Sequence, residues 1–117
     1  MGTDRDRIEN YLPLRPVEFH ILLSLADGER HGYGIIQDIE ARGDAAVPDV
    51  GTMYRALARM ADSGLIKAAP SAGRGDERRN CYRLTEIGLR VAKLEAQRLH
   101  ALTRVARVSG LLEKKAT

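Results

Sequence analysis

Several residue types are scarce in this chain of 117 residues, and each scarcity excludes a class of protein. The single cysteine, Cys81, excludes an intramolecular disulfide and is typical of a reducing compartment. No apolar run approaches the roughly 20 residues of a membrane span, and the charged N-terminal residues lack the organisation of a signal peptide. We therefore expect a cytoplasmic protein that does not contact a membrane.

Aromatic residues make up only 4% of the chain and tryptophan is absent, so much of the core must be aliphatic. The three histidines show no metal-ligand spacing, and one cysteine cannot complete a thiolate site. The serines lack the context of a nucleophile, and the carboxylates form no pair in an apolar segment. We accordingly expect no metal site, no cofactor and no enzymatic activity.

What remains is an ordinary globular balance, with 44% hydrophobic and 30% charged residues, enough for one domain with a modest core. The charge is unevenly placed. Residues 1–50 contain five Lys or Arg and ten Asp or Glu, whereas residues 51–117 contain fourteen and six. This asymmetry suggests that one side of the folded molecule faces a polyanion.

Residues 50–66 form the segment around which the chain is organised. Met53, Leu57 and Met60 recur at helical spacing and predict a buried stripe. Asp49 is suited to capping the start of this helix, and Gly64 to ending it. Polar groups share the opposite face, at Thr52, Arg55 and Arg59. Such a face suits the phosphates and base edges of a nucleic acid, although a solvated surface helix can look the same.

Two further helices are predicted before this segment and one after it. A nearly all-apolar helix begins at Pro16, and a second runs from His31 to Arg42. From Ile66 to Leu84 the hydrophobic period changes to two, which indicates two strands joined by a long turn. The turn is basic and we assign its arginines to DNA phosphates: Arg74, Arg78 and Arg79. Charge at such a tip can also serve only to keep a loop soluble.

The last predicted helix, Glu86 to Ser109, is roughly 36 Å long at 1.5 Å per residue. A domain of this size cannot cover the whole length of such a helix, so its apolar stripe requires a second copy of the chain. The residues that we assign to this contact lie on the first and last helices: Phe19, Leu22, Val91, Leu94, Leu99, Leu102 and Val105.

This order of elements predicts a mainly α fold with a small β-hairpin, a winged helix-turn-helix followed by a long dimerisation helix. We divide the chain into an N-terminal arm (1–12), a winged helix-turn-helix domain (13–85) and a dimerisation helix with its tail (86–117). The third helix of such a domain enters a major groove, while the hairpin reaches the neighbouring backbone or minor groove.

The sequence also resembles the PadR-like transcriptional regulators. The resemblance rests on LPLRPVEFHILLSLADGERHGYGIIQDIE, VGTMYRALARMADSGLI and RRNCYRLTEIG, which together span most of residues 12–88. It implies a winged-helix repressor, usually dimeric, that a small molecule or another signal releases from its operator. The chain is similar to the short form, with a single C-terminal helix.

The matching motifs place Thr52 and Tyr54 at the start of the recognition helix and His31-Gly32-Tyr33 at the start of the supporting helix. Arg78 and Arg79 match the basic residues before the second wing strand. The chain departs from the family pattern at Arg15, where Ser or Thr often caps the first helix. It departs again at Pro48, which is separated from Gly51-Thr52, so the resemblance does not fix the pose of the recognition helix.

Single residues leave alternatives open. Thr52 either donates to a phosphate or caps its own helix, and Tyr54 either reaches the DNA backbone or packs. His31 is more simply a helix cap than a ligand, and Cys81 an inert strand residue than a redox switch. For the whole chain, the hypothesis is a transcriptional repressor that binds double-stranded DNA at a pseudo-palindromic operator and has a possible small-molecule effector. The alternative is a winged-helix module that binds an acidic protein and no DNA.

Overall fold

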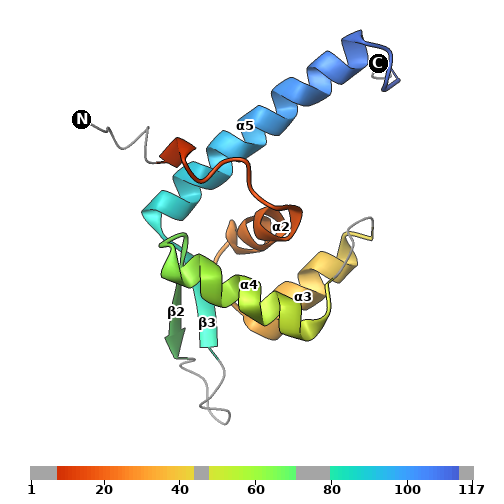
Figure 1. Cartoon of the computed structure of the whole chain (residues 1–117). Helices are drawn as coiled ribbons and strands as arrows, with labels where there is room; N and C mark the ends of the chain where they lie inside the picture. Colours follow the sequence, from red (N-terminus) through yellow and green to blue (C-terminus); the bar gives the residue numbers. More distant parts are fainter. Residues whose placement is uncertain (1–7, 44–47, 71–79, 114–117) are drawn as a thin grey trace, which may run out of the picture.

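The computed structural model describes residues 8–43, 48–70 and 80–113. Within these residues, four helices alternate along the chain with three strands, which form one sheet (Figure 1). The order is α2 (Pro16–Leu25), β1 (Arg30–His31), α3 (Gly32–Ala41), α4 (Val50–Asp62), β2 (Ile66–Pro70), β3 (Asn80–Leu84) and α5 (Glu86–Val108). The predicted fold class, mainly α with a small β-hairpin and a long last helix, is confirmed.

The sheet contains one strand more than the sequence predicted. β3 lies in the centre, with β2 and β1 antiparallel on its two sides. Arg30 pairs with Tyr82 and His31 with Cys81, so the segment before α3 closes the second edge of the hairpin. A strand of two residues has no alternating pattern, so the hydrophobic period could not predict it. His31 ends β1, and the helix begins at Gly32.

The predicted helix boundaries in the second half of the chain are confirmed. The Asp49 side chain accepts a hydrogen bond from Thr52 N–H at 2.8 Å and caps α4. Gly64 ends that helix with φ +87°, and the N–H of Leu65 returns to the carbonyl of Met60, which is a Schellman closure. Thr85 caps α5 by accepting from Gly88 N–H. Capping residues and a glycine in the left-handed region thus fix both ends of the helix that carries the arginines.

One aliphatic core joins the helices to the inner side of the sheet. Its fully buried members include Ile21, Leu25, Ile35, Met53 and Leu57. Two residues assigned to a contact between copies belong here instead: Leu22 and Val91 each have 0% exposed surface within one chain. That assignment was wrong, because an almost wholly apolar α2 fills the space between α3, α4 and α5 and leaves these side chains no outer face.

A polar network joins α2 to α3. Arg42 donates to the Ser24 hydroxyl at 3.0 Å and to Asp38 at 2.9 Å, and its guanidinium lies 3.2 Å from Nδ1 of His20. Burial lowers the pKa of His20 and the charge of Arg42 lowers it further, which keeps the ring neutral and able to accept. Arg42 therefore fixes the angle between the two helices.

The long helix α5 is anchored through its N-terminal half. Gly88 lies against the backbone carbonyl of Leu65, and the buried Glu95 accepts the Leu14 N–H at 3.0 Å. Figure 1 shows the C-terminal half of α5 projecting away from the other elements. The body of the domain is thus complete without the distal half of this helix.

Candidate nucleic-acid interface

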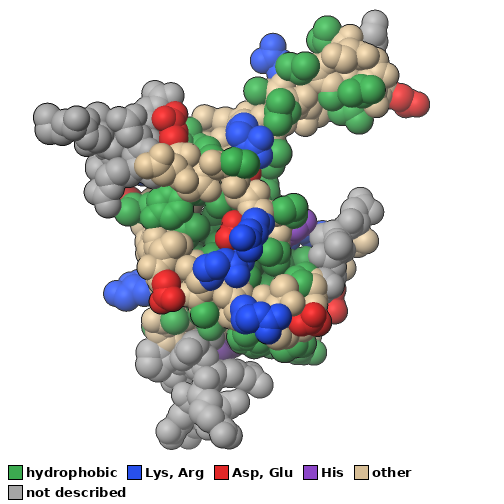
Figure 2. All heavy atoms as spheres, in the orientation of Figure 1, with side chains coloured by type: hydrophobic (Ala, Val, Ile, Leu, Met, Phe, Trp, Pro, Cys, Tyr) green, Lys and Arg blue, Asp and Glu red, His purple; other side chains and the backbone are tan. Residues whose placement is uncertain are grey.

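Helix α4 separates its apolar and polar residues onto opposite faces. Met53, Ala56, Leu57 and Met60 are buried, whereas Arg55 and Arg59 are exposed. Figure 2 shows Lys and Arg side chains over the outer surface of α4. We call this outer surface, defined by Thr52, Arg55 and Arg59, the α4 outer face. Its cationic groups are available to a ligand outside the chain.

The first turn of α4 holds Arg55 through a chain of hydrogen bonds. The Thr52 hydroxyl donates to Oδ2 of Asp49 at 3.1 Å and accepts from Nη2 of Arg55 at 3.1 Å. The pKa of Asp49 is lowered chiefly by the bond from Thr52 N–H, then by the Thr52 hydroxyl and the charge of Arg55. Thr52 therefore caps its helix and also orients an arginine.

Arg59 is held in a different way, by α2. Its Nη2 lies 3.6 Å from Oε2 of Glu18, whose other oxygen accepts the Arg15 N–H at 2.9 Å. Glu18 therefore satisfies the N–H of Arg15 at the start of α2, where the side chain of Arg15 forms no capping hydrogen bond. Arg59 remains exposed, but one carboxylate already partly neutralises it.

Tyr54 and Tyr33 lie where α4 meets α3. A Cβ added at Gly32 would lie 2.8 Å from the Tyr54 ring, so that ring occupies the space left by the glycine. The packing alternative for Tyr54 therefore describes one edge of its ring and its hydroxyl end, which lie against Gly32, and 42% of the residue is still exposed. Tyr33, on α3, is 60% exposed. Tyr54 thus joins α4 to α3 while part of its surface remains open.

His31 occupies the N-cap position of α3, but its side chain makes no capping hydrogen bond. The expectation that His31 stands at the cap of this helix is confirmed, although its ring takes no part in the cap. The ring instead lies 3.7 Å from Sγ of Cys81 across the β1–β3 pair, because the two residues are opposed in register. Both are half-buried, so His31 belongs to the sheet side of the domain more than to the α4 outer face.

The three arginines assigned to the turn of the wing, Arg74, Arg78 and Arg79, lie outside the described residues. The strands themselves carry cations that the sequence analysis did not assign to the site. Lys67 and Arg83 are directly opposed in the β2–β3 register, and both are exposed. Like charges placed directly opposite each other destabilise a sheet by themselves. Their position is understandable if this face of the wing meets a polyanion.

The projecting part of α5 exposes a continuous series of apolar side chains, and Figure 2 shows hydrophobic groups gathered on this end of the molecule. Leu102 is 53% and Val105 60% exposed, and Leu99 is also exposed, whereas Phe19 and Leu94 are half-buried against the core. The sequence analysis missed the continuation of the series, although its three- and four-residue spacing was there to read: Val108, Leu111 and Leu112.

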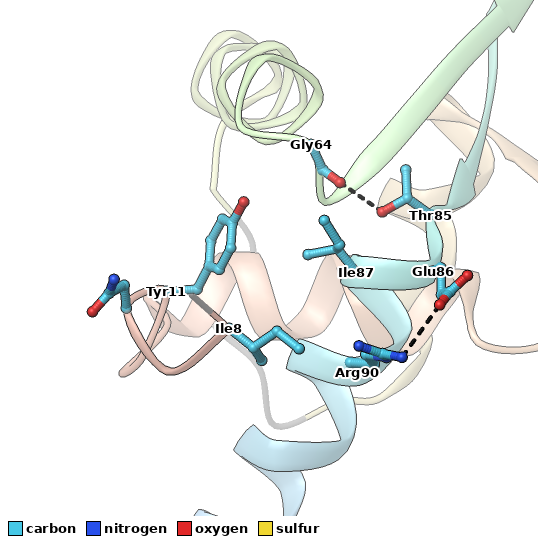
Figure 3. A pocket seen from close by; sticks show the side chains of 8 residues that line it. Ile8, Tyr11, Gly64, Thr85, Glu86, Ile87 and Arg90 are labelled. Atoms are coloured by element: carbon cyan, nitrogen blue, oxygen red, sulfur yellow. Dashed lines mark hydrogen bonds and ion pairs between the residues drawn. The ribbon is translucent and has the colours of Figure 1, made fainter. Parts of the chain in front are cut away.

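A cavity of about 730 Å³ lies at the base of α5 (Figure 3). Its walls come from the N-terminal turn, the end of α4 and the first turns of α5: Ile8, Asn10, Tyr11, Gly64, Thr85, Glu86, Ile87 and Arg90. Two hydroxyls tie these elements together. Tyr11 donates to the carbonyl of Ser63 at 2.6 Å, and Thr85 donates to that of Gly64 at 2.6 Å. The cavity therefore adjoins the bonds that set the orientation of α4.

The arrangement of these elements agrees with that of a known protein family. The model of the transcriptional regulator PadR-like family matches residues 21–94. The chain belongs to this family. The match covers the second half of α2, all of α3, α4 and the three strands, and the first part of α5, so it includes the helix that carries the α4 outer face.

Solved PadR-like structures share the fold. A PadR family transcription regulator from Clostridium difficile is 28% identical, with a TM-score of 0.69 over 80% of this chain and 96% of that one. A transcriptional regulator from Clostridium thermocellum is also 28% identical, with a TM-score of 0.65 over 92% and 95%. Bacillus subtilis PadR in complex with operator DNA is 25% identical, with a TM-score of 0.60 over 68% and 46%. Comparison with curated proteins gave no significant match.

In the described parts of this PadR-like chain, none of the helices combines the length and the hydropathy that a bilayer crossing requires. In the same residues, no three His, Cys, Asp or Glu side chains gather in a way that could hold a metal ion.

Proposed function

We propose that this PadR-like chain is a sequence-specific DNA-binding repressor that acts as a homodimer and is released from DNA by a small molecule or another signal. The observation that carries the proposal is the α4 outer face, where two arginines and a threonine lie opposite a fully buried apolar stripe. A recognition helix placed in a major groove requires this division of its two sides.

The charges of the wing also favour DNA as the partner. Lys67 and Arg83 form an exposed cationic pair on the strands, and the arginines of the turn extend the charge along the chain. A polyanion relieves the repulsion between opposed cations, and phosphate contacts of this kind fix the register of a protein on the duplex. The solved complex of Bacillus subtilis PadR with operator DNA makes double-stranded DNA the natural partner to test.

The proposed dimer fits the two-fold symmetry of a pseudo-palindromic operator. Two copies that join through the projecting ends of α5 would present two α4 outer faces to one duplex. Half-sites for such a pair lie about 34–36 Å apart, one turn of the double helix, and the operator is accordingly pseudo-palindromic. Leu99, Leu102 and Val105, continued by Val108, supply the apolar surface for this contact.

The cavity at the base of α5 is our candidate site for the releasing signal. Ile8, Tyr11 and Ile87 give it apolar walls, and it suits a small ligand with an apolar body. A ligand there would press on the Tyr11 and Thr85 bonds to the end of α4. A thermal-shift screen of small organic molecules, repeated with Ile87→Trp to fill the cavity, tests this part. Stabilisation that persists unchanged in the filled variant would place the ligand elsewhere.

The decisive experiment measures DNA binding at several salt concentrations. Wild-type protein is titrated by fluorescence anisotropy against duplexes from the upstream region of its own gene. We expect the logarithm of the binding constant to fall linearly with the logarithm of salt, because each phosphate contact releases counterions. The double variant Arg55→Ala, Arg59→Ala should bind weakly and show a shallower slope.

Lys93→Ala is the matched control, because it removes one exposed cation from α5 rather than from the α4 outer face. It should bind DNA almost as the wild type does. If the double variant bound as tightly as this control, the α4 outer face would not be the reading surface. If the wild type bound no duplex at any salt concentration, a module for an acidic protein partner would replace the proposal.

A further inference from the structure

Arg55 and Arg59 differ in how they are held, although the sequence gives them the same role. Arg59 is paired with Glu18 on α2, at 3.6 Å. The guanidinium of Arg55 instead turns back along its own helix to Thr52, one turn toward the N-terminus. Because the N-terminal residues of a recognition helix are those nearest the base edges, the two arginines face different parts of the duplex.

The hydroxyl of Thr52 has its hydrogen-bonding capacity committed within the chain. It has one proton, which it donates to Asp49 at 3.1 Å, and a lone pair accepts Nη2 of Arg55 at 3.1 Å. No proton remains for a phosphate oxygen. These bonds therefore favour a role for Thr52 in holding Arg55 over the alternative that Thr52 donates to a phosphate.

Gly51 provides the space in which the guanidinium lies. A Cβ at this position would lie 3.3 Å from Nη1 of Arg55 and 3.4 Å from Oδ1 of Asp49. The first distance is tighter than an ordinary contact, and the atom that would have to move is the far end of a flexible side chain. A Cβ at residue 51 would thus shift the end of the Arg55 side chain by a few tenths of an ångström without disturbing the backbone of α4.

We propose that Asp49, Gly51 and Thr52 form a positioning set that holds Arg55 for reading a guanine in the operator, whereas Arg59 contacts the phosphate backbone. This inference rests on the DNA binding proposed above. An arginine that is ordered before binding loses less side-chain freedom when it binds, and a planar guanidinium fits the O6 and N7 acceptors of guanine with two bonds. Asp49 is a positioning residue, as is Thr52, and Arg55 is the reading residue.

The test is a selection from random duplex DNA, followed by sequencing, with the full-length wild type and matched variants. We expect the wild type to enrich a motif with a preferred G·C pair in each half-site. In Arg55→Ala the preference at that pair should fall by roughly 5- to 150-fold, the range of a good bidentate contact. Arg55→Lys should lose part of this preference while keeping more of its affinity, because an ammonium lacks the rigid planar fork that matches the O6 and N7 acceptors.

Four variants separate the positioning of Arg55 from an effect on folding and from a phosphate contact. Thr52→Val removes the hydroxyl at constant shape and should lose several-fold of the guanine preference, whereas Thr52→Ser should restore it. Gly51→Ala should weaken the preference by a smaller factor, although alanine is the better helix former and the melting temperature should not fall. Arg59→Ala should weaken binding to all sequences alike and leave the motif intact.

The outcomes are distinguishable from a failure of the proposed function. A wild type that enriches no motif would contradict the proposed function, and the inference would fall with it. A wild type that enriches a motif which Arg55→Ala and Thr52→Val leave unchanged would overturn the inference alone. A motif lost in Arg59→Ala but kept in Arg55→Ala would exchange the roles of the two arginines and overturn it too.

Discussion

Glu95 illustrates how much of this fold depends on single polar side chains. Its carboxylate is 1% exposed, accepts the Leu14 N–H and receives two bonds from Arg98, at 2.6 and 2.9 Å. The bonds from Arg98 are the main cause of a lowered pKa at Glu95, against the effect of burial. At the residue scale, this carboxylate ties the segment before α2 to the middle of α5.

We predict that Glu95→Gln lowers the free energy of unfolding by roughly 1–3 kcal/mol at pH 7, because bonds to a charged group are replaced by weaker ones. Since the folded-state pKa of Glu95 is lowered, the contribution of its charge is complete above the ordinary value of 4.5 and is lost as the pH falls through the folded-state pKa. Urea unfolding across pH 7 to 3 should therefore show the two proteins converging in acid.

Glu86→Gln is the control for this prediction. Glu86 pairs with Arg90 at 3.3 Å, but its side chain is 82% exposed, so the substitution should change stability little at any pH. A difference between wild type and Glu95→Gln that stayed constant down to pH 3 would show that the charge of Glu95 does not stabilise the fold.

Elements begin and end where local chemistry dictates, and this part of the fold could be predicted from the sequence. Asp49, Gly64 and Thr85 are visible as caps or stops without any tertiary information. The strand β1 was not predictable in the same way, because two residues carry no period. The partner of Gly32 was also unpredictable, since the ring that fills its empty space comes from Tyr54 on another helix.

Glycines at element contacts give a prediction at this scale. A Cβ at Gly88 would overlap the backbone carbonyl of Leu65, and neither backbone can move without separating α5 from the start of β2. We expect Gly88→Ala to lower the free energy of unfolding by roughly 1–3 kcal/mol or more, as overpacking does. Thermal and urea unfolding followed by circular dichroism measure this loss.

Gly34→Ala is the matched control on α3, where the nearest atom to an added Cβ is 3.9 Å away. Alanine favours the helix by up to about 1 kcal/mol over glycine, so this variant should be as stable as the wild type or more stable. A Gly88→Ala variant as stable as Gly34→Ala would show that the contact with Leu65 does not restrict position 88.

At the scale of the whole molecule, the described residues form two parts: a body in which the helices and the sheet share one core, and a rod, which is the projecting C-terminal half of α5. The pattern of α5 predicted a helix too long for its own domain, and its exposed stripe agrees with that reasoning. The sequence misassigned Leu22 and Val91 because periodicity marks every apolar residue of a stripe alike. Whether such a residue meets its own domain or a second copy depends on where the neighbouring elements stop, which no local pattern records.

At this scale we predict that Leu102→Glu, Val105→Glu yields a folded monomer with weakened DNA binding. Two carboxylates cannot be buried between apolar faces without a large cost in free energy, while the body of the domain does not use these side chains. Light scattering coupled to gel filtration measures the mass. Arg104→Glu adds a carboxylate about 100° around the helix from Val105 and should leave the dimer intact. A double variant with the mass of a dimer would refute the role of the stripe.

Thr85 has a consequence for how operators can evolve. Its hydroxyl bonds to the carbonyls of Gly64 and Leu65, so the end of α4 is joined directly to the start of the rod. In the proposed dimer, the separation of the two half-sites is then a property of the rod alone, while their bases are chosen by the first turn of α4. Spacing and base preference can change independently, through substitutions in different parts of the gene.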